Sequence, residues 1–280
     1  MFADDTKLFN IIKRPEHQEE LQEDLYNMDD WSDAWLLGFN LDKCIKMHIG
    51  PNKKPFSYKL QGELLDTETE EKDIGVIVDH DLTFDKHILA KVKKANQMWG
   101  MIRRNFEFLD ATIFPLLFKT IVRPHLETAV SVWAPYKKEH IKKIEGVQRR
   151  ATKYLPGMKD LSYPQRLRKL KLPTLMYRRL RGDLIEAYKI LKPIYDSNVR
   201  PVLTRLKDVA TYTGLRGYET HLYLKHGQNN TRKYSFSLRI VDHWNSLPDD
   251  VIKSNTVNSF KNNIDRIYEA RDIYYDFPYL

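Results

Sequence analysis

The spacing of apolar residues changes once along this chain, and that change limits its fold more than any other feature. From Ile88 to Phe106 apolar residues recur every three or four positions, the period of a helix with one buried face. Prolines separate this stretch from later segments with the same character. Further helices are therefore predicted around residues 110–122, 138–154, 174–191 and 257–268.

The first 84 residues have a different pattern, with short runs typical of strands separated by turn signals. A helix is predicted from Pro15 to Leu37, with an apolar face, ending in Trp31 and Trp35, that we expect to pack on those strands. The fold class predicted is α+β, with a small partial sheet followed by a mainly helical body. Residues 234–238 are compatible with a strand or a helix. Strands are predicted around residues 7–12, 44–49, 56–60 and 73–78.

Composition excludes several classes of protein. The chain has 280 residues, of which 30% are charged, and no apolar run approaches the roughly 18 residues that a membrane span requires. The first seven residues carry two aspartates where a signal peptide would carry basic residues. Cys44 is the single cysteine, so no intrachain disulfide can form. We therefore expect a protein without membrane partners, located in the cytoplasm or nucleus.

The net charge of +8 is distributed very unevenly. Residues 1–90 hold 10 Lys and Arg against 20 Asp and Glu, residues 91–192 hold 24 against 8, and residues 193–280 hold 12 against 10. The basic central block favours a polyanionic partner such as nucleic acid, although a solvated helical surface remains an alternative. The residues expected to contact phosphates are Lys93, Lys94, Arg103, Arg104, Arg149, Arg150, Lys153, Arg178, Arg179 and Arg181.

Asp4 and Asp5 lie between two short β-type runs, an arrangement that predicts a tight hairpin with carboxylates at its tip. Paired carboxylates of this kind can hold Mg²⁺, and in two-metal phosphoryl transfer such ions stabilise the attacking and leaving oxygens. A plain solvated Asp-Asp turn is the alternative reading of the dipeptide alone.

Other segments favour the catalytic reading of this pair. The segment Phe2-Ala3-Asp4-Asp5 resembles the aromatic-Ala-Asp-Asp catalytic hairpin of reverse transcriptases, specifically those of non-LTR retrotransposons of the jockey and CR1 kind. The later segments that resemble the family, in the family's order, are Trp31–Cys44, Asp73–His87, Val122–Glu127, Val147–Lys153, Arg178–Ile185 and Trp244–Lys261.

The resemblance implies a partial palm over residues 1–84, a basic helical thumb or connection over 85–192, and a C-terminal extension over 193–280. It implies RNA-directed DNA synthesis, with Asp4 and Asp5 as catalytic Mg²⁺ ligands and with RNA and DNA as template and primer. Gly75 and Val76 would belong to a hairpin near the primer terminus.

In the family, a further metal-binding aspartate and the fingers precede the segment that begins at Met1. We therefore expect a truncated fragment with a weak or incomplete magnesium site that is inactive alone. Three alternatives remain open. The chain could be a nucleic-acid-binding remnant, a domain with a structural or interaction role, or an open reading frame without selected function.

Overall fold

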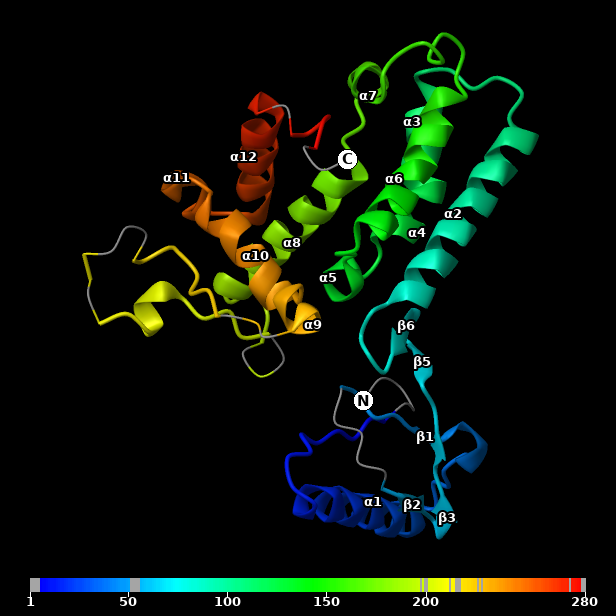
Figure 1. The fold of residues 1–280 in the computed structure, drawn as a ribbon, viewed down its shortest axis with the longest axis vertical. Helices are drawn as coiled ribbons and strands as arrows, with labels where there is room; N and C mark the ends of the chain where they lie inside the picture. Colours follow the sequence, from blue (N-terminus) through cyan, green and yellow to red (C-terminus); the bar gives the residue numbers. More distant parts are fainter. Residues whose placement is uncertain are drawn as a thin grey trace. The chain divides into compact units, whose positions relative to one another are not determined.

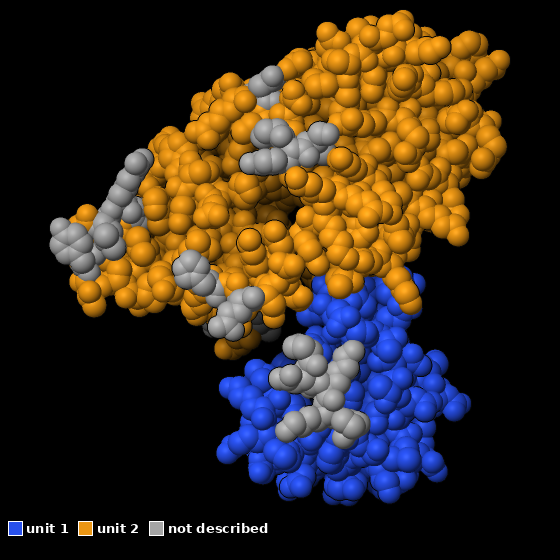
Figure 2. Space-filling view, in the orientation of Figure 1, with its two compact units in different colours: residues 1–82 blue, residues 83–280 orange. Residues whose placement is uncertain are grey.

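The computed structural model describes residues 6–50, 56–196, 198, 201–211, 213–214, 218–225, 227, 229–271 and 273–277. The chain divides into two compact units, residues 1–82 and 83–280, which are coloured separately in Figure 2. The described part of the chain contains mostly helices and a few short strands, so the predicted α+β class is confirmed. None of its described helices combines the length and apolar character that spanning a bilayer requires.

The first unit contains one long helix, α1 (Glu16–Trp35), where the sequence predicts one. Leu25 packs with Tyr58 and Leu60 in a small core. The Gln22 side chain exchanges two hydrogen bonds with the backbone of Lys59, at 2.9 and 2.8 Å, and so ties the helix to β2 (Lys59–Leu60). Leu36, with a φ of 53°, ends the helix in the left-handed conformation.

The apolar face of α1 is covered around Leu25 and is left exposed at its C-terminal end. Trp31 is 47% exposed and Trp35 is 66% exposed, and the two rings contact each other with centroids 6.4 Å apart. The strands beside α1 are only two residues long, so they cover the helix around Leu25 and extend no further.

The strands of the first unit form three separate two-stranded pairs (Figure 1). Their bounds are as follows: β1 (Ile45–Lys46) runs parallel to β4 (Asp66–Thr67), β2 runs antiparallel to β3 (Glu63–Leu64), and β5 (Glu70–Asp73) runs antiparallel to β6 (Val76–Asp79). A short 3₁₀ turn, Leu41–Lys43, precedes β1.

The strand predicted at residues 7–12 is absent: residues 6–12 have no regular secondary structure. The ring Nδ1 of His17 lies 2.9 Å from the carbonyl oxygen of Ile11 and 3.3 Å from the amide nitrogen of Lys13. A side chain of the following helix thus contacts this backbone, and Ile11 and Lys13 make no strand ladder there.

The second unit begins with α2 (Asp85–Asn105), the longest helix of the described chain. It packs against α6 (Lys138–Lys153), against α4 (Pro124–Glu127) and against a π-helical turn, η2 (Phe118–Val122) (Figure 1). Pro124 has no N–H with which to continue an α-helical ladder, and in the turn the amide of Arg123 bonds the carbonyl of Phe118 at 2.9 Å. The other short helices here are α3 (Ile113–Leu117), α5 (Val130–Trp133) and α7 (Tyr163–Leu170).

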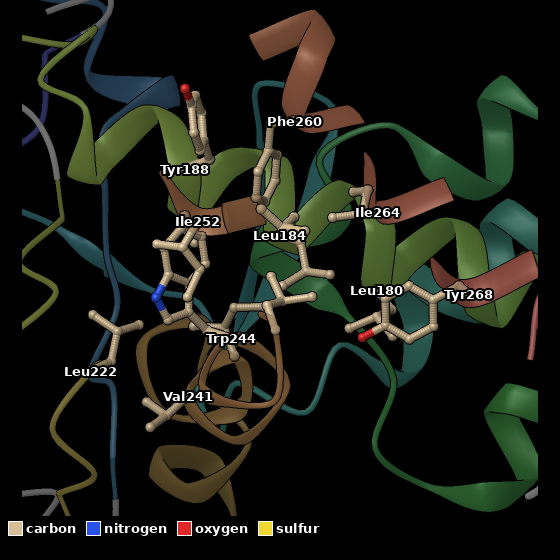
Figure 3. Close-up of a cluster of buried hydrophobic side chains, with 14 of the residues drawn as sticks. Leu180, Leu184, Tyr188, Leu222, Val241, Trp244, Ile252, Phe260, Ile264 and Tyr268 are labelled. Atoms are coloured by element: carbon tan, nitrogen blue, oxygen red, sulfur yellow. The ribbon is translucent and has the colours of Figure 1, made fainter. Parts of the chain in front are cut away.

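A second hydrophobic cluster joins α8 (Leu175–Leu191) to the C-terminal helices (Figure 3). Tyr188 of α8 stacks on Phe260, with centroids 4.4 Å apart, and Trp244 lies 5.9 Å from the same ring. Residues 234–238, compatible with strand or helix, lie at the start of a helix. The elements of this region are η3 (Leu206–Asp208), α9 (Asn230–Lys233), α10 (Phe236–Asn245), α11 (Asp249–Ile252) and α12 (Val257–Ala270).

Candidate nucleic-acid interface

Helices α2 and α6 pack together through small and apolar residues, and this packing directs their charged residues outward. Ala95 and Ile102 of α2 and Val147 and Ala151 of α6 are almost fully buried. Since a helix repeats every 3.6 residues, the basic side chains between these positions must lie on the remaining, solvated faces. The exposed basic residues among those predicted to bind phosphate are Lys93, Lys94, Arg103, Arg104, Arg149, Arg150 and Lys153.

Two of these arginines are held by contacts between the helices. Arg150 of α6 donates a hydrogen bond from Nη2 to Oδ1 of Asn96 on α2, at 3.1 Å. Arg103 of α2 lies over the ring of Tyr154, 4.4 Å from its centroid, and Tyr154 follows the last residue of α6. The guanidinium groups therefore lie near the seam between the two helices, where both helices present positive charge to solvent.

Tyr154 extends this charged surface with an aromatic ring. Its ring meets Trp99 edge to face, with centroids 5.7 Å apart, while half of the residue stays exposed. Trp99 is 7% exposed, so it serves as a buried support rather than as a stacking surface. An exposed aromatic ring beside guanidinium groups can stack on a base while the arginines contact phosphates.

A shallow groove runs along α2 beside the basic residues. Gly100 leaves space in this groove because it has no side chain. Arg104 folds back over this space, with Nη1 3.4 Å from the position that a Cβ of residue 100 would take. The lining combines apolar stems with amide and basic groups, and its residues are Leu89, Val92, Lys93, Asn96, Gln97, Gly100 and Arg104.

Three of the arginines predicted to contact phosphates lie on α8. Two of them form ion pairs with carboxylates of other helices, and the third is buried. Arg178 makes a two-pronged ion pair with Glu127, at 2.9 and 2.8 Å, and the hydrogen-bonded carboxylate raises the pKa of Arg178. Arg181 makes a similar pair with Asp265, at 2.6 and 2.8 Å. Arg179 is only 6% exposed. These positive charges are therefore matched within the fold or shielded by it.

Arg179 lies in a buried polar network around Glu145 of α6. The Glu145 carboxylate accepts hydrogen bonds from Tyr163 Oη and from the first two amides of α8, those of Leu175 and Met176, at 3.1 and 3.2 Å. Burial raises the pKa of Glu145, and the charge of Arg179 together with these hydrogen bonds opposes the rise. A carboxylate at a helix N-terminus is favoured by the helix dipole, so Glu145 anchors α8 to α6.

The predicted primer-region residues Gly75 and Val76 lie in the first unit, at the turn between β5 and β6. Ile74 and Gly75 both have positive φ, 43° and 77°, which is typical of a two-residue type I′ hairpin turn. Val76 is buried, whereas Ile74 is 71% exposed at the tip. The strand predicted around residues 73–78 is therefore interrupted by this turn, and the role of Gly75 and Val76 near a primer stays a prediction.

Asp4 and Asp5, the predicted catalytic and Mg²⁺-binding pair, lie outside the described residues. Within the described ranges, no group of three or more His, Cys, Asp or Glu side chains is placed to hold a metal ion. The magnesium site therefore stays a prediction from the sequence.

Sequence reasoning did not select Tyr154, Asn96 or Gly100 as parts of this surface. A signal for two of them was present, because Lys93, Asn96, Gly100 and Arg104 follow each other at spacings of three and four residues. Tyr154 could be found only from the fold, because its place depends on how α6 packs against Trp99.

Comparison with curated proteins finds RNA-directed DNA polymerases of mobile elements. The chain is 29% identical over 168 residues to the RNA-directed DNA polymerase from mobile element jockey of Drosophila funebris, covering 56% of this chain and 18% of that protein. It is 25% identical over 164 residues to the probable RNA-directed DNA polymerase from transposon X-element of Drosophila melanogaster, with the same coverage of 56% and 18%. For the probable polymerase from transposon BS of Drosophila melanogaster, identity is 26% over 141 residues, covering 47% of this chain and 15% of that protein.

These relatives confirm the resemblance to non-LTR retrotransposon reverse transcriptases over about half of the chain. The chain spans less than a fifth of the length of the jockey and X-element relatives, with 18% of each covered. No family model matches the chain. No solved structure matches it either.

Proposed function

We propose that this chain is a reverse transcriptase-related fragment of a mobile element whose helices α2 and α6 bind the phosphate backbone of RNA or DNA. The observation that carries the proposal is that seven of the Lys and Arg residues predicted to contact phosphate are exposed on two packed helices. The similarity of the chain to RNA-directed DNA polymerases supports nucleic acid as the polyanion.

The length of the surface sets the expected number of contacts. Lys93 and Arg104 are eleven residues apart on α2, which corresponds to about 16 Å at the helical rise of about 1.5 Å per residue. Phosphates along one strand of a duplex advance by about 3.4 Å, so this length matches about five of them. We therefore expect binding with little sequence preference, dominated by about five phosphate contacts.

Salt dependence tests this proposal. Neutralising about five phosphates gives a slope of log affinity against log salt of about −3.5 on single strands and about −4.5 on duplex. Replacing Arg149 and Arg150 together with Gln should flatten the slope by up to about two units and weaken all sequences alike. The assay is fluorescence anisotropy with labelled RNA, DNA and hybrid duplex at several salt concentrations.

A double variant of Lys253, which follows α11, and Arg266 of α12, Lys253→Gln with Arg266→Gln, is the matched control, because both residues are exposed and the charge change is the same. Its slope should equal that of the unmodified protein. Binding that is absent at low salt, or equally affected by both double variants, would contradict the proposal. In that case the alternative of a structural or interaction domain gains support.

We also propose that this chain does not extend a primer by itself. The family resemblance assigns only Asp4 and Asp5 of this sequence to the metal site, and a third carboxylate is needed to hold two Mg²⁺ ions in line with the reacting phosphate. The test is incorporation of deoxynucleotides on an RNA template with Mg²⁺, with Asp4→Asn as the control. Template-dependent incorporation that disappears in Asp4→Asn would show that the chain is an active polymerase.

A further inference from the structure

A second group of basic side chains lies where η2, α4, α8 and α12 come together. Four cations and two carboxylates meet there. Lys119 comes from η2, Arg123 precedes α4, and Arg178 and Arg181 come from α8, while the carboxylates are Glu127 of α4 and Asp265 of α12. The group therefore carries a net charge of about +2 before any ligand is considered.

The two carboxylates are already paired with other side chains of this group. Glu127 accepts both prongs of Arg178 and also lies 3.5 Å from Nε of Arg123. Asp265 accepts both prongs of Arg181 and, at 2.6 Å, the hydroxyl of Tyr177. Each carboxylate therefore serves two side chains, and among the described residues no hydrogen bond or ion pair joins either carboxylate to Lys119.

Lys119 is the cation of this group that takes part in none of these ion pairs. Within the described ranges its ammonium group has no hydrogen bond or ion pair, although the side chain is partly buried. Burial and the neighbouring charges of Arg123 and Arg178 lower the pKa of Lys119. The terminal nitrogens of Arg123 likewise lack a hydrogen-bond partner among the described residues, and its side chain is only 18% exposed.

Partly buried positive charge in excess of its counter-ions costs free energy, and an anion that reaches both Lys119 and Arg123 would relieve that cost. An ammonium offers three donors and a guanidinium offers a planar fork, a combination that suits an anion with several oxygens around one centre. A net charge of +2 further favours an anionic ligand.

We propose that Lys119 and Arg123 form a binding site for a phosphoryl group at the junction of η2 and α4. This site is separate from the surface proposed on α2 and α6 and does not depend on it. The phosphoryl group has two possible sources: a free or terminal phosphate, or a phosphodiester of a nucleic-acid backbone. In both cases Glu127 keeps Arg123 in place and Arg178 keeps Glu127 in place, through the ion pairs already described.

Inorganic phosphate is the probe that tests the site, with chloride at equal ionic strength as the reference. We expect phosphate to raise the melting temperature of the unmodified protein and to bind with millimolar affinity. Lys119→Gln should weaken phosphate binding at least about tenfold, since it removes charge-assisted hydrogen bonds. Without phosphate the same variant should melt at an equal or higher temperature, because it removes a repelling charge rather than a paired one.

Three further variants test whether the effect is specific to this site. Arg123→Gln should also weaken phosphate binding about tenfold, and it leaves the pair between Glu127 and Arg178 intact. Lys253→Gln, an exposed lysine on another part of the unit, should change neither property. The double variant of Arg149 and Arg150 should retain the phosphate response, which separates failure of this site from failure of the α2 and α6 surface.

The sources are distinguished by competition. Short oligonucleotides with and without a 5′-phosphate are compared as competitors of inorganic phosphate. Competition only by the phosphorylated one indicates a terminal phosphate, and equal competition indicates a phosphodiester. The proposal is overturned if phosphate has no more effect than chloride, or if Lys119→Gln binds phosphate as well as the unmodified protein. It is also overturned if Lys119→Gln lowers the melting temperature without phosphate, because that result indicates a structural lysine.

Discussion

Acidification should destabilise the second unit through one buried histidine, His87 in the first turn of α2. Its side chain is 1% exposed, and its ring lies 5.1 Å from the ring of Trp133. Burial, with a contribution from the positive charge of Lys91, lowers the pKa of His87 from about 6.5 to about 4. The folded protein therefore keeps this imidazole neutral over a range in which the unfolded chain binds a proton.

The sign and size of the effect follow from this difference. The pKa is lower in the folded state, so the stabilising contribution is fully present above pH 6.5 and is lost as pH falls to about 4. The complete loss corresponds to about 3 kcal/mol of unfolding free energy, and about 2 kcal/mol of it should be lost by pH 5.

Urea unfolding between pH 7 and pH 4.5 measures this loss, with His87→Phe as the comparison. The substitution keeps an aromatic ring beside Trp133 but removes the titrating group. Carboxylates titrate in both proteins, so the informative quantity is the difference in unfolding free energy between them at each pH. That difference should shift in favour of His87→Phe by about 2 kcal/mol between pH 7 and pH 5. A difference that stays constant with pH would refute the reasoning.

Three further substitutions test local features of the fold. Glu145→Gln should lower the unfolding free energy by about 3 kcal/mol, because it removes the buried charge that faces Arg179 and the start of α8; urea unfolding measures the loss. Gly100→Ala should raise the unfolding free energy by about 0.5 to 1 kcal/mol, because α2 gains helix propensity. The new Cβ would contact only the end of the flexible Arg104 side chain, at 3.4 Å, and thermal unfolding checks the sign of the change. Ile74→Asn should slow amide exchange in the hairpin of β5 and β6, because asparagine tolerates the φ of 43° better than a β-branched residue; faster exchange would contradict a strained turn.

The helices could be predicted from the sequence because each carries its own evidence. The apolar stripe from Ile88 to Phe106 predicts α2, and helices also lie where the sequence predicts them at residues 138–154 and 174–191. The strands could not be predicted equally well, because a strand depends on a partner that the local sequence does not specify. Residues 7–12 have the composition of a strand, and in the structure the ring of His17 contacts their backbone instead of a neighbouring strand.

The candidate surface was only partly predictable for a related reason. Charge counting identifies basic residues, and the helical period places seven of the ten predicted phosphate contacts on the exposed faces of α2 and α6. It does not reveal which arginines are paired, because the partners are distant in sequence. Asp265, the partner of Arg181, lies 84 residues away, and Glu127, the partner of Arg178, lies 51 residues away.

This pairing changes how the basic central block should behave with salt. If all ten predicted residues contacted phosphates, the slope on duplex would be about −9, and the seven exposed residues alone would give at most about −6.3. A slope between about −4.5 and −6.3 is therefore compatible with binding through α2 and α6. A steeper slope would require phosphate contacts beyond these seven residues. Contacts by Arg178 and Arg181 would require both to leave Glu127 and Asp265, which would expose two carboxylates to the nucleic acid. Because that exchange replaces short ion pairs with repulsion, the arginines of α8 are expected to stay within the fold when nucleic acid binds.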